Sequence, residues 1–148
     1  MEKEITLKGK FRIACLRDNE VIAEREIDNT IMNAGKAIVS GLILTDVGGT
    51  AFDYLAVGTS ATAPNATQTA LIAEKYRVAG TGSRQTTTVT NDTARLTGSI
   101  AITASNSIQE AGIFNSSSAG SLLARTTFSA ISVSASDTLN VGYSVKVS

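Results

Sequence analysis

The sequence of 148 residues contains no histidine and no tryptophan, and cysteine and proline occur only once each. Without histidine, the chain can build neither a Ser-His-Asp triad nor a histidine-based metal site. A single cysteine can form neither an internal disulfide nor a thiolate zinc site. The absence of tryptophan disfavours a lectin-like site in which sugars stack on an indole ring. The composition therefore excludes several common kinds of active site.

Neither sign of charge is in excess, because thirteen Lys and Arg residues balance thirteen Asp and Glu residues. Nucleic-acid binding requires surplus basic residues that neutralise phosphates, so no nucleic-acid partner is expected. The longest apolar run, residues 37–44, is too short to span a membrane, and the charged start MEKEITLKGK lacks the apolar segment of a secretory signal. We expect a protein that is made in a cytoplasm and has no membrane partner.

Ser and Thr together account for 35 residues, and apolar residues make up 43% of the chain. This balance is typical of short strands joined by tight turns, and it argues against disorder. The sequence predicts a single domain over residues 1–148 with an all-β fold, an antiparallel β-sandwich or a jelly-roll-like arrangement. One short helix is expected near residues 33–45, with Asn33 as its N-cap.

The N-terminal segment predicts a β-hairpin over residues 1–28 that is part of the sandwich or appended to it. Residues 5–16 alternate strictly between apolar and polar side chains, which is the period of a half-buried strand. After a turn at 17–19, pairing Leu16 with Glu20 keeps the patterns of the two strands in phase. In this register Arg12 faces Glu24, Lys10 faces Glu26 and Lys8 faces Asp28.

Further strands are expected at residues 52–57, 85–90, 94–104, 108–114, 122–128 and 139–147. The strands 85–90 and 94–104 would form a hairpin that turns at Asn91 and Asp92. Residues 80–82 are expected to be a flexible turn, whereas residues 70–76 fit either a helical turn or an extended segment. Residues 58–69, which include the only proline, are the longest predicted loop.

Glu110 is an acidic residue inside an otherwise apolar run, IQEAGIF. It could be a buried acid with a raised pKa, as a glycosidase would need, but a salt bridge to Arg125 or Arg77 is favoured. Cys15 lies on the apolar side of the first strand, which predicts a buried structural thiol rather than a nucleophile. We expect a non-enzymatic protein without cofactor or metal.

Residues 96–148 carry only four charged side chains: Glu110, Arg125, Asp137 and Lys146. A surface so poor in charge is typical of one that a partner covers. The alternative is a neutral face that Ser and Thr hydroxyls keep solvated. We favour burial against a partner, because zero net charge also permits close packing of many copies.

Four segments occur in an order and spacing that resemble a group of tailed-bacteriophage virion proteins. They are NAGK at 33–36, AVGTSATAPNATQTAL at 56–71, EAGIF at 110–114 and DTLNVGYSV at 137–145. The resemblance covers about residues 30–148, and one departure is Ser60, where the group often has glycine. Proteins of this group are capsid decoration or cement proteins, tail-fibre proteins or other tail components. The resemblance implies a virion location and no catalytic residues.

A cement protein on the capsid exterior, which bridges and stabilises major capsid subunits, is the favoured expectation. A tail-fibre or receptor-binding appendage is the alternative, although the small size favours cement over a complete fibre. The expected partners are the major capsid protein and copies of the chain itself, as a dimer or trimer. Besides the charge-poor half, the predicted contact residues lie in the 58–69 loop and the N-terminal hairpin: Gly58, Thr59, Pro64, Asn65, Lys8, Lys10 and Arg12.

Overall fold

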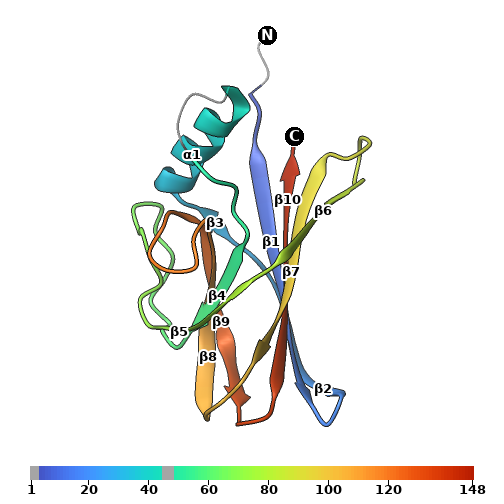
Figure 1. Ribbon diagram of the computed structural model, residues 1–148, viewed down its shortest axis with the longest axis vertical. Coiled ribbons are helices and arrows are strands. Elements are labelled where there is room, and N and C mark those ends of the chain that lie inside the picture. The colour runs from blue at the N-terminus through green and yellow to red at the C-terminus, as the bar shows by residue number, and fades with distance from the viewer. Residues whose placement is uncertain (1–3, 45–48) are drawn as a thin grey trace.

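A computed structural model describes residues 4–44 and 49–148, which form a sandwich of two antiparallel sheets (Figure 1). Sheet A has the strand order β2-β1-β10-β7-β6, and sheet B has the order β3-β9-β8-β4-β5. The strands are β1 (Leu7–Arg17), β2 (Glu20–Asp28), β3 (Thr30–Ile31), β4 (Tyr54–Gly58), β5 (Glu74–Ala79), β6 (Thr81–Gln85), β7 (Thr93–Ala101), β8 (Asn106–Phe114), β9 (Leu122–Val133) and β10 (Thr138–Val147). Helix α1 (Asn33–Leu44) lies at one end. The predicted all-β sandwich with one short helix is confirmed.

The core lies between the sheets and is built from alternate, inward-facing residues of the strands other than β6. The inward residues of β1 and β10 are buried side by side: Phe11, Ile13, Cys15, Leu139, Val141 and Tyr143. The rings of Phe11 and Tyr143 pack at a tilt, with their centres 4.7 Å apart. Because β1 supplies this much of the core, the N-terminal hairpin is part of the sandwich rather than an appendage.

The β1–β2 hairpin forms, but the predicted register is wrong by two residues. A turn of two residues, Asp18 and Asn19, joins the strands, and both have positive φ values (53° and 63°). A bulge after Cys15 then shifts the pairing by one residue. The even turn and the bulge together keep the apolar residues of both strands in phase, which the side-chain pattern requires.

Two of the three expected ion pairs of the hairpin form, as diagonal contacts, and the third, between Lys8 and Asp28, does not. Arg12 lies opposite Glu26 rather than Glu24, and Lys10 lies opposite Asp28. Nevertheless, Lys10 Nζ is 3.2 Å from Glu26, and Arg12 Nε donates to Glu24 at 2.6 Å. Long side chains reach diagonal neighbours on an antiparallel pair, so the charge pattern identified the contacts but not the register.

The chain changes sheets between β5 and β6, which the sequence analysis missed. β5 pairs with β4 in sheet B, and β6 pairs with β7 in sheet A. Gly80 links them where a Cβ atom would lie 2.7 Å from the Leu96 side chain. The flexible turn predicted at 80–82 is therefore wrong, and so is the hairpin arm predicted at 85–90, because residues 86–92 form the loop that leads to β7.

Helix α1 agrees with the helix predicted near residues 33–45, but the predicted N-cap is wrong by one residue. The carbonyl of Met32 accepts the first helical hydrogen bond (3.0 Å), so Met32 rather than Asn33 occupies the N-cap position. Asn33 is the first helical residue, and its backbone N–H donates to the carbonyl of Ala66 (2.9 Å). Gly35 contacts β9 so closely that a Cβ atom would lie 2.7 Å from the Leu123 backbone. These contacts fix the helix at the end of sheet B.

Candidate interaction surfaces

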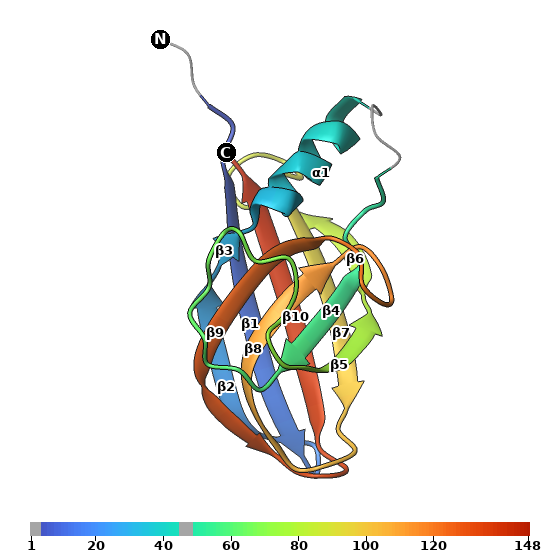
Figure 2. The same cartoon turned by 90° about the vertical axis from the view of Figure 1, so that its left-hand side faces the viewer.

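The segment that follows β4 crosses the outer face of sheet B and covers it (Figure 2). We call residues 59–73 the strap. Leu71 of the strap is buried over β8, where a Cβ atom at Gly112 would lie 2.7 Å from it. On this face the strap closes a small apolar cluster that consists of Met32, Ala56, Leu71, Phe114 and Leu122. The loop predicted at 58–69 is present, from residue 59 on, and it lies against the sheet as part of this cover.

A buried ion pair anchors the strap. Glu110 of β8 and Arg125 of β9 are both fully buried, and Arg125 Nη2 and Nε lie 2.8 and 3.0 Å from Glu110 Oε2. The carboxylate also accepts the backbone N–H groups of Ile72 (3.1 Å) and Ala73 (2.7 Å), while Arg125 Nη1 donates to the Thr62 carbonyl (2.8 Å). Such partners are required because an unpaired buried charge carries a large desolvation penalty. The salt-bridge alternative for Glu110 is confirmed, with Arg125 as the partner.

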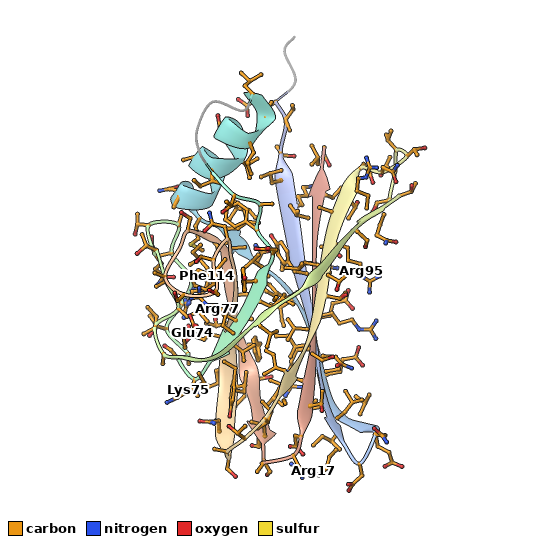
Figure 3. The ribbon with its side chains drawn as sticks, viewed as in Figure 1. Arg17, Glu74, Lys75, Arg77, Arg95 and Phe114 are labelled. Atoms are coloured by element: carbon orange, nitrogen blue, oxygen red, sulfur yellow. The ribbon has the colours of Figure 1, made fainter. Side chains whose placement is uncertain are left out.

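Arg77, the other candidate partner of Glu110, holds a different loop. Its Nη2 lies 2.6 Å from Glu74, and its guanidinium lies over the ring of Phe114, 3.7 Å from the ring centre (Figure 3). Its Nη1 donates to two backbone carbonyls of the turn at 115–121, each at 2.9 Å. The charge of Arg77 is thus satisfied within the fold, where it closes the turn between β8 and β9.

Most of the predicted contact residues in the 58–69 loop are engaged within the molecule. Gly58 is buried, and Thr59 and Pro64 are half-buried. The N–H of Thr59 donates to the carbonyl of Ala73 (3.0 Å). Asn65 is exposed, although its side-chain oxygen accepts a backbone N–H two residues further on (2.9 Å). Of these four residues, Asn65 is the one presented at the surface.

The outer face of sheet A is open and concave. A groove of about 910 Å³ runs across β2, β1, β10 and β7, and Lys10 and Arg12 line it together with Glu24 and Glu26. The ion pairs within the hairpin balance these four charges. Between β1 and β7 the groove is lined by small and polar residues: Thr97, Ser99, Asn140, Gly142 and Ser144. This face therefore presents a polar surface without net charge from the hairpin.

Two further basic residues extend this polar face. Lys8 is exposed nearer the start of β1, opposite Lys146 of β10. Arg95 of β7 lines the groove and projects from sheet A on the side away from sheet B (Figure 3). The basic residues predicted as contacts therefore lie on sheet A, whereas the predicted loop residues lie over sheet B. The two sets lie on opposite faces, so they cannot contact one flat partner together.

Exposed apolar side chains gather at the end of the sandwich that carries α1. Nine large hydrophobic side chains are exposed among the residues that the structure describes, and six lie in segments at this end: Ile5, Leu42, Ile43, Leu44, Val89 and Val147. Helix α1, the start of β1, the end of β10 and the β6–β7 loop all reach this end (Figures 1 and 2). We call these six side chains the apolar end.

A groove of about 520 Å³ between α1 and the start of β1 belongs to the apolar end. Ile5 and Ile43 line it from its two sides, and Val39 and Ile31 also contribute. The sequence analysis missed this surface, although a signal was present. Three consecutive apolar residues, Leu42 to Leu44, cannot all face the core from one helix, so some of them must be exposed.

A buried carboxylate lies near the tip of the β1–β2 hairpin. Arg17 Nε and Nη2 donate to Asp137 at 2.9 and 2.8 Å, and the N–H of Ser134 donates to it at 2.8 Å. The hydrogen bonds from Arg17 lower the pKa of Asp137 to about 2. The neighbouring Cys15 is fully buried, which confirms its predicted burial. Burial raises the pKa of its thiol, so the reactive thiolate form is disfavoured.

Within residues 4–44 and 49–148, no three or more His, Cys, Asp or Glu side chains gather where they could hold a metal ion. No helix in the described part of the chain is long and apolar enough to cross a membrane. Comparison of the chain with models of protein families, with curated proteins and with solved structures finds no match in any of the three. The resemblance to tailed-bacteriophage virion proteins therefore stays a prediction.

Proposed function

We propose that the protein is a non-enzymatic structural component of a bacteriophage virion, a cement protein that docks onto the major capsid protein through its apolar end. The observation that carries this proposal is the apolar end itself, whose six side chains are 38–77% exposed. Apolar side chains that gather on the surface of a small protein mark a site of interaction. No comparable gathering is found elsewhere on the described residues, where Val21, Ile22 and Ile72 are the other large exposed hydrophobic residues.

The apolar end can contribute substantial binding energy. Full burial of a Leu or Ile side chain contributes about 1.5–3 kcal/mol. Ile43 and Leu44 are 68% and 77% exposed, so their burial in an interface would contribute about 1–2 kcal/mol each. A cement protein that contacts two neighbouring subunits gains further affinity, because its second contact is intramolecular. Modest contacts of this kind suit a protein that binds a repeating capsid lattice.

The positions of the resembling segments also support the proposal. NAGK opens α1, residues 56–71 include most of β4 and most of the strap, EAGIF ends β8, and DTLNVGYSV lies almost entirely within β10. The resemblance therefore extends over the strap and over one partner of its buried anchor, Glu110. A likeness spread over the elements that hold the sandwich together is more informative than one short surface motif.

The binding test compares two double variants on capsids that lack the protein. Ile43→Ser/Leu44→Ser removes two side chains from the apolar end, and Val21→Ser/Ile22→Ser removes two exposed side chains from the start of β2, at the opposite end (Figure 1). We expect the first variant to bind capsids roughly 30- to 1,000-fold more weakly than the unmodified protein. The second should bind normally. Circular dichroism checks that both are folded, and equal binding by the two variants would refute docking through the apolar end.

A second experiment tests the location in the particle. Purified virions are separated into heads and tails, and the protein is quantified in each fraction by mass spectrometry. Many copies on heads would agree with the cement role, whereas a few copies on tails would favour the alternative, a tail-fibre or receptor-binding appendage. Absence from both fractions would refute a virion role.

A further inference from the structure

The sandwich has free sheet edges, and one of them is unprotected. Sheet A ends at β2 and β6, and sheet B ends at β3 and β5. An edge strand presents unpaired backbone N–H and C=O groups, and proteins commonly protect such edges with charged side chains or with very short strands. β3 has two residues, and charged residues occupy five of the nine positions in β2 and three of the six in β5. In β6 all five residues are exposed, and Arg84 is the single charged one.

From this contrast we infer that β6 is an interface at which two copies of the chain join, with β6 of one copy antiparallel to β6 of the other. A two-fold axis at Ser83 sets Ser83 opposite Ser83 of the second copy, Thr81 opposite Gln85 and Gly82 opposite Arg84. The two five-stranded A sheets then form one continuous sheet. The inference goes beyond the proposed function, because it holds whether or not the protein belongs to a virion.

Charge and space both suit this pairing of β6. Each Arg84 meets a glycine rather than another charge, so no like charges lie opposite each other. Gly82 leaves room for that side chain, because a Cβ atom built there would have only the Arg95 carbonyl within 4 Å, at 4.0 Å. The same operation on β2, centred on Glu24, would set that carboxylate opposite its own copy, which is destabilising. A second copy therefore fits at β6 but not at β2.

Disulfide trapping tests the register directly. Opposed Cα atoms on antiparallel strands lie about 4.5–5.5 Å apart, which is within the range that a disulfide bridges. Ser83→Cys should therefore form a covalent dimer under mild oxidation of the purified protein. The native thiol, Cys15, is fully buried and should not interfere. Ser117→Cys is the control, since Ser117 is exposed on the turn between β8 and β9, away from β6. Crosslinking of Ser83→Cys no faster than that of Ser117→Cys would overturn the inference.

A pair of charge variants at one position tests the same interface without a crosslink. Gly82→Lys places a second positive charge opposite Arg84 of the other copy, and Gly82→Glu places a negative one there. Because the contact occurs twice in the dimer, Gly82→Lys should raise the dimer Kd by roughly 2- to 30-fold and Gly82→Glu should lower it. Analytical ultracentrifugation measures both, with circular dichroism to confirm folding. Identical dissociation constants, or a monomer at every concentration, would overturn the inference.

The measurements on purified protein separate this inference from the proposed function. A dimer that responds to charge at residue 82, in a protein that fails to bind capsids, would keep the inference and reject the cement role. A monomer whose capsid binding responds to the Gly82 variants would mean that an extended segment of the capsid protein pairs with β6. That outcome would overturn the inference and leave the cement role standing.

Discussion

Replacing Arg125 with methionine should remove a large part of the stability of the fold, because the change deletes a charge and keeps most of the side-chain volume. The Glu110 carboxylate would stay fully buried without its cation, and the strap would lose the hydrogen bonds from Nη1 to Thr62 and Gln68. Removing one partner of a buried ion pair costs about 3–5 kcal/mol. Three strap N–H groups, those of Ser60, Ile72 and Ala73, still donate to the carboxylate, so we expect the lower part of this range, about 3–4 kcal/mol.

Urea unfolding followed by circular dichroism measures this loss, which should also lower Tm by roughly 6–16 °C. The double variant Glu110→Gln/Arg125→Met is the control, because glutamine keeps an acceptor for the strap N–H groups and carries no charge. It should be more stable than Arg125→Met alone, since no unpaired charge is left buried. The reasoning is refuted if Arg125→Met loses less than about 1 kcal/mol, well below the range for a broken buried pair, or if the double variant is the less stable of the two.

Two other predictions concern packing and pH. Gly9→Ala should destabilise the protein by about 1–3 kcal/mol in urea unfolding, because its Cβ atom would lie 2.3 Å from the Tyr143 hydroxyl. Gly142→Ala should be near neutral, because the nearest atom across the sheet, the Arg12 carbonyl oxygen, would be 3.9 Å from its Cβ atom. Equal losses in the two variants would contradict the packing argument. Since Arg17 lowers the pKa of Asp137 from 3.8 to about 2, the stability that this carboxylate contributes is present above about pH 4 and is lost as the pH falls through about 2. Urea midpoints measured over this range should fall less steeply in Asp137→Asn, and an unchanged slope would count against this role of the carboxylate.

Features that follow from local pattern could be predicted, whereas features that depend on distant contacts could not. The strict alternation of β1 predicted which of its side chains are buried, Cys15 among them. The register of the hairpin depends on a bulge, and two different combinations of turn and bulge keep the same alternation. β6 reads TGSRQ and has no apolar alternation, so its strand conformation comes from pairing with β7 after the chain changes sheets at Gly80.

The candidate surfaces show the same limit. Glycine and proline mark residues 58–69 as irregular, but they do not show whether the segment projects or is anchored, and its anchor, Glu110 and Arg125, lies far away in the sequence. The small number of charged residues in 96–148 was interpreted as a property of the surface. In the fold, Glu110, Arg125 and Asp137 are all buried and paired, and the fourth charged residue of 96–148, Lys146, is half-buried. These residues form the central strands of both sheets, where side chains are largely buried. The fold itself therefore accounts for much of the small number of charged residues.

The two proposed interfaces together would make the protein a bridge. A two-fold axis that sets the β6 strands antiparallel also reverses the long direction of the sandwich, so the apolar ends of the two copies would point in opposite directions. One dimer could then contact two capsid sites, each through one apolar end. Gly82→Lys, which separates the copies without touching the apolar end, should therefore weaken capsid reinforcement more than it weakens the binding of a single copy to an isolated capsid subunit. Equal weakening of both would show that the copies do not act as a pair on the capsid.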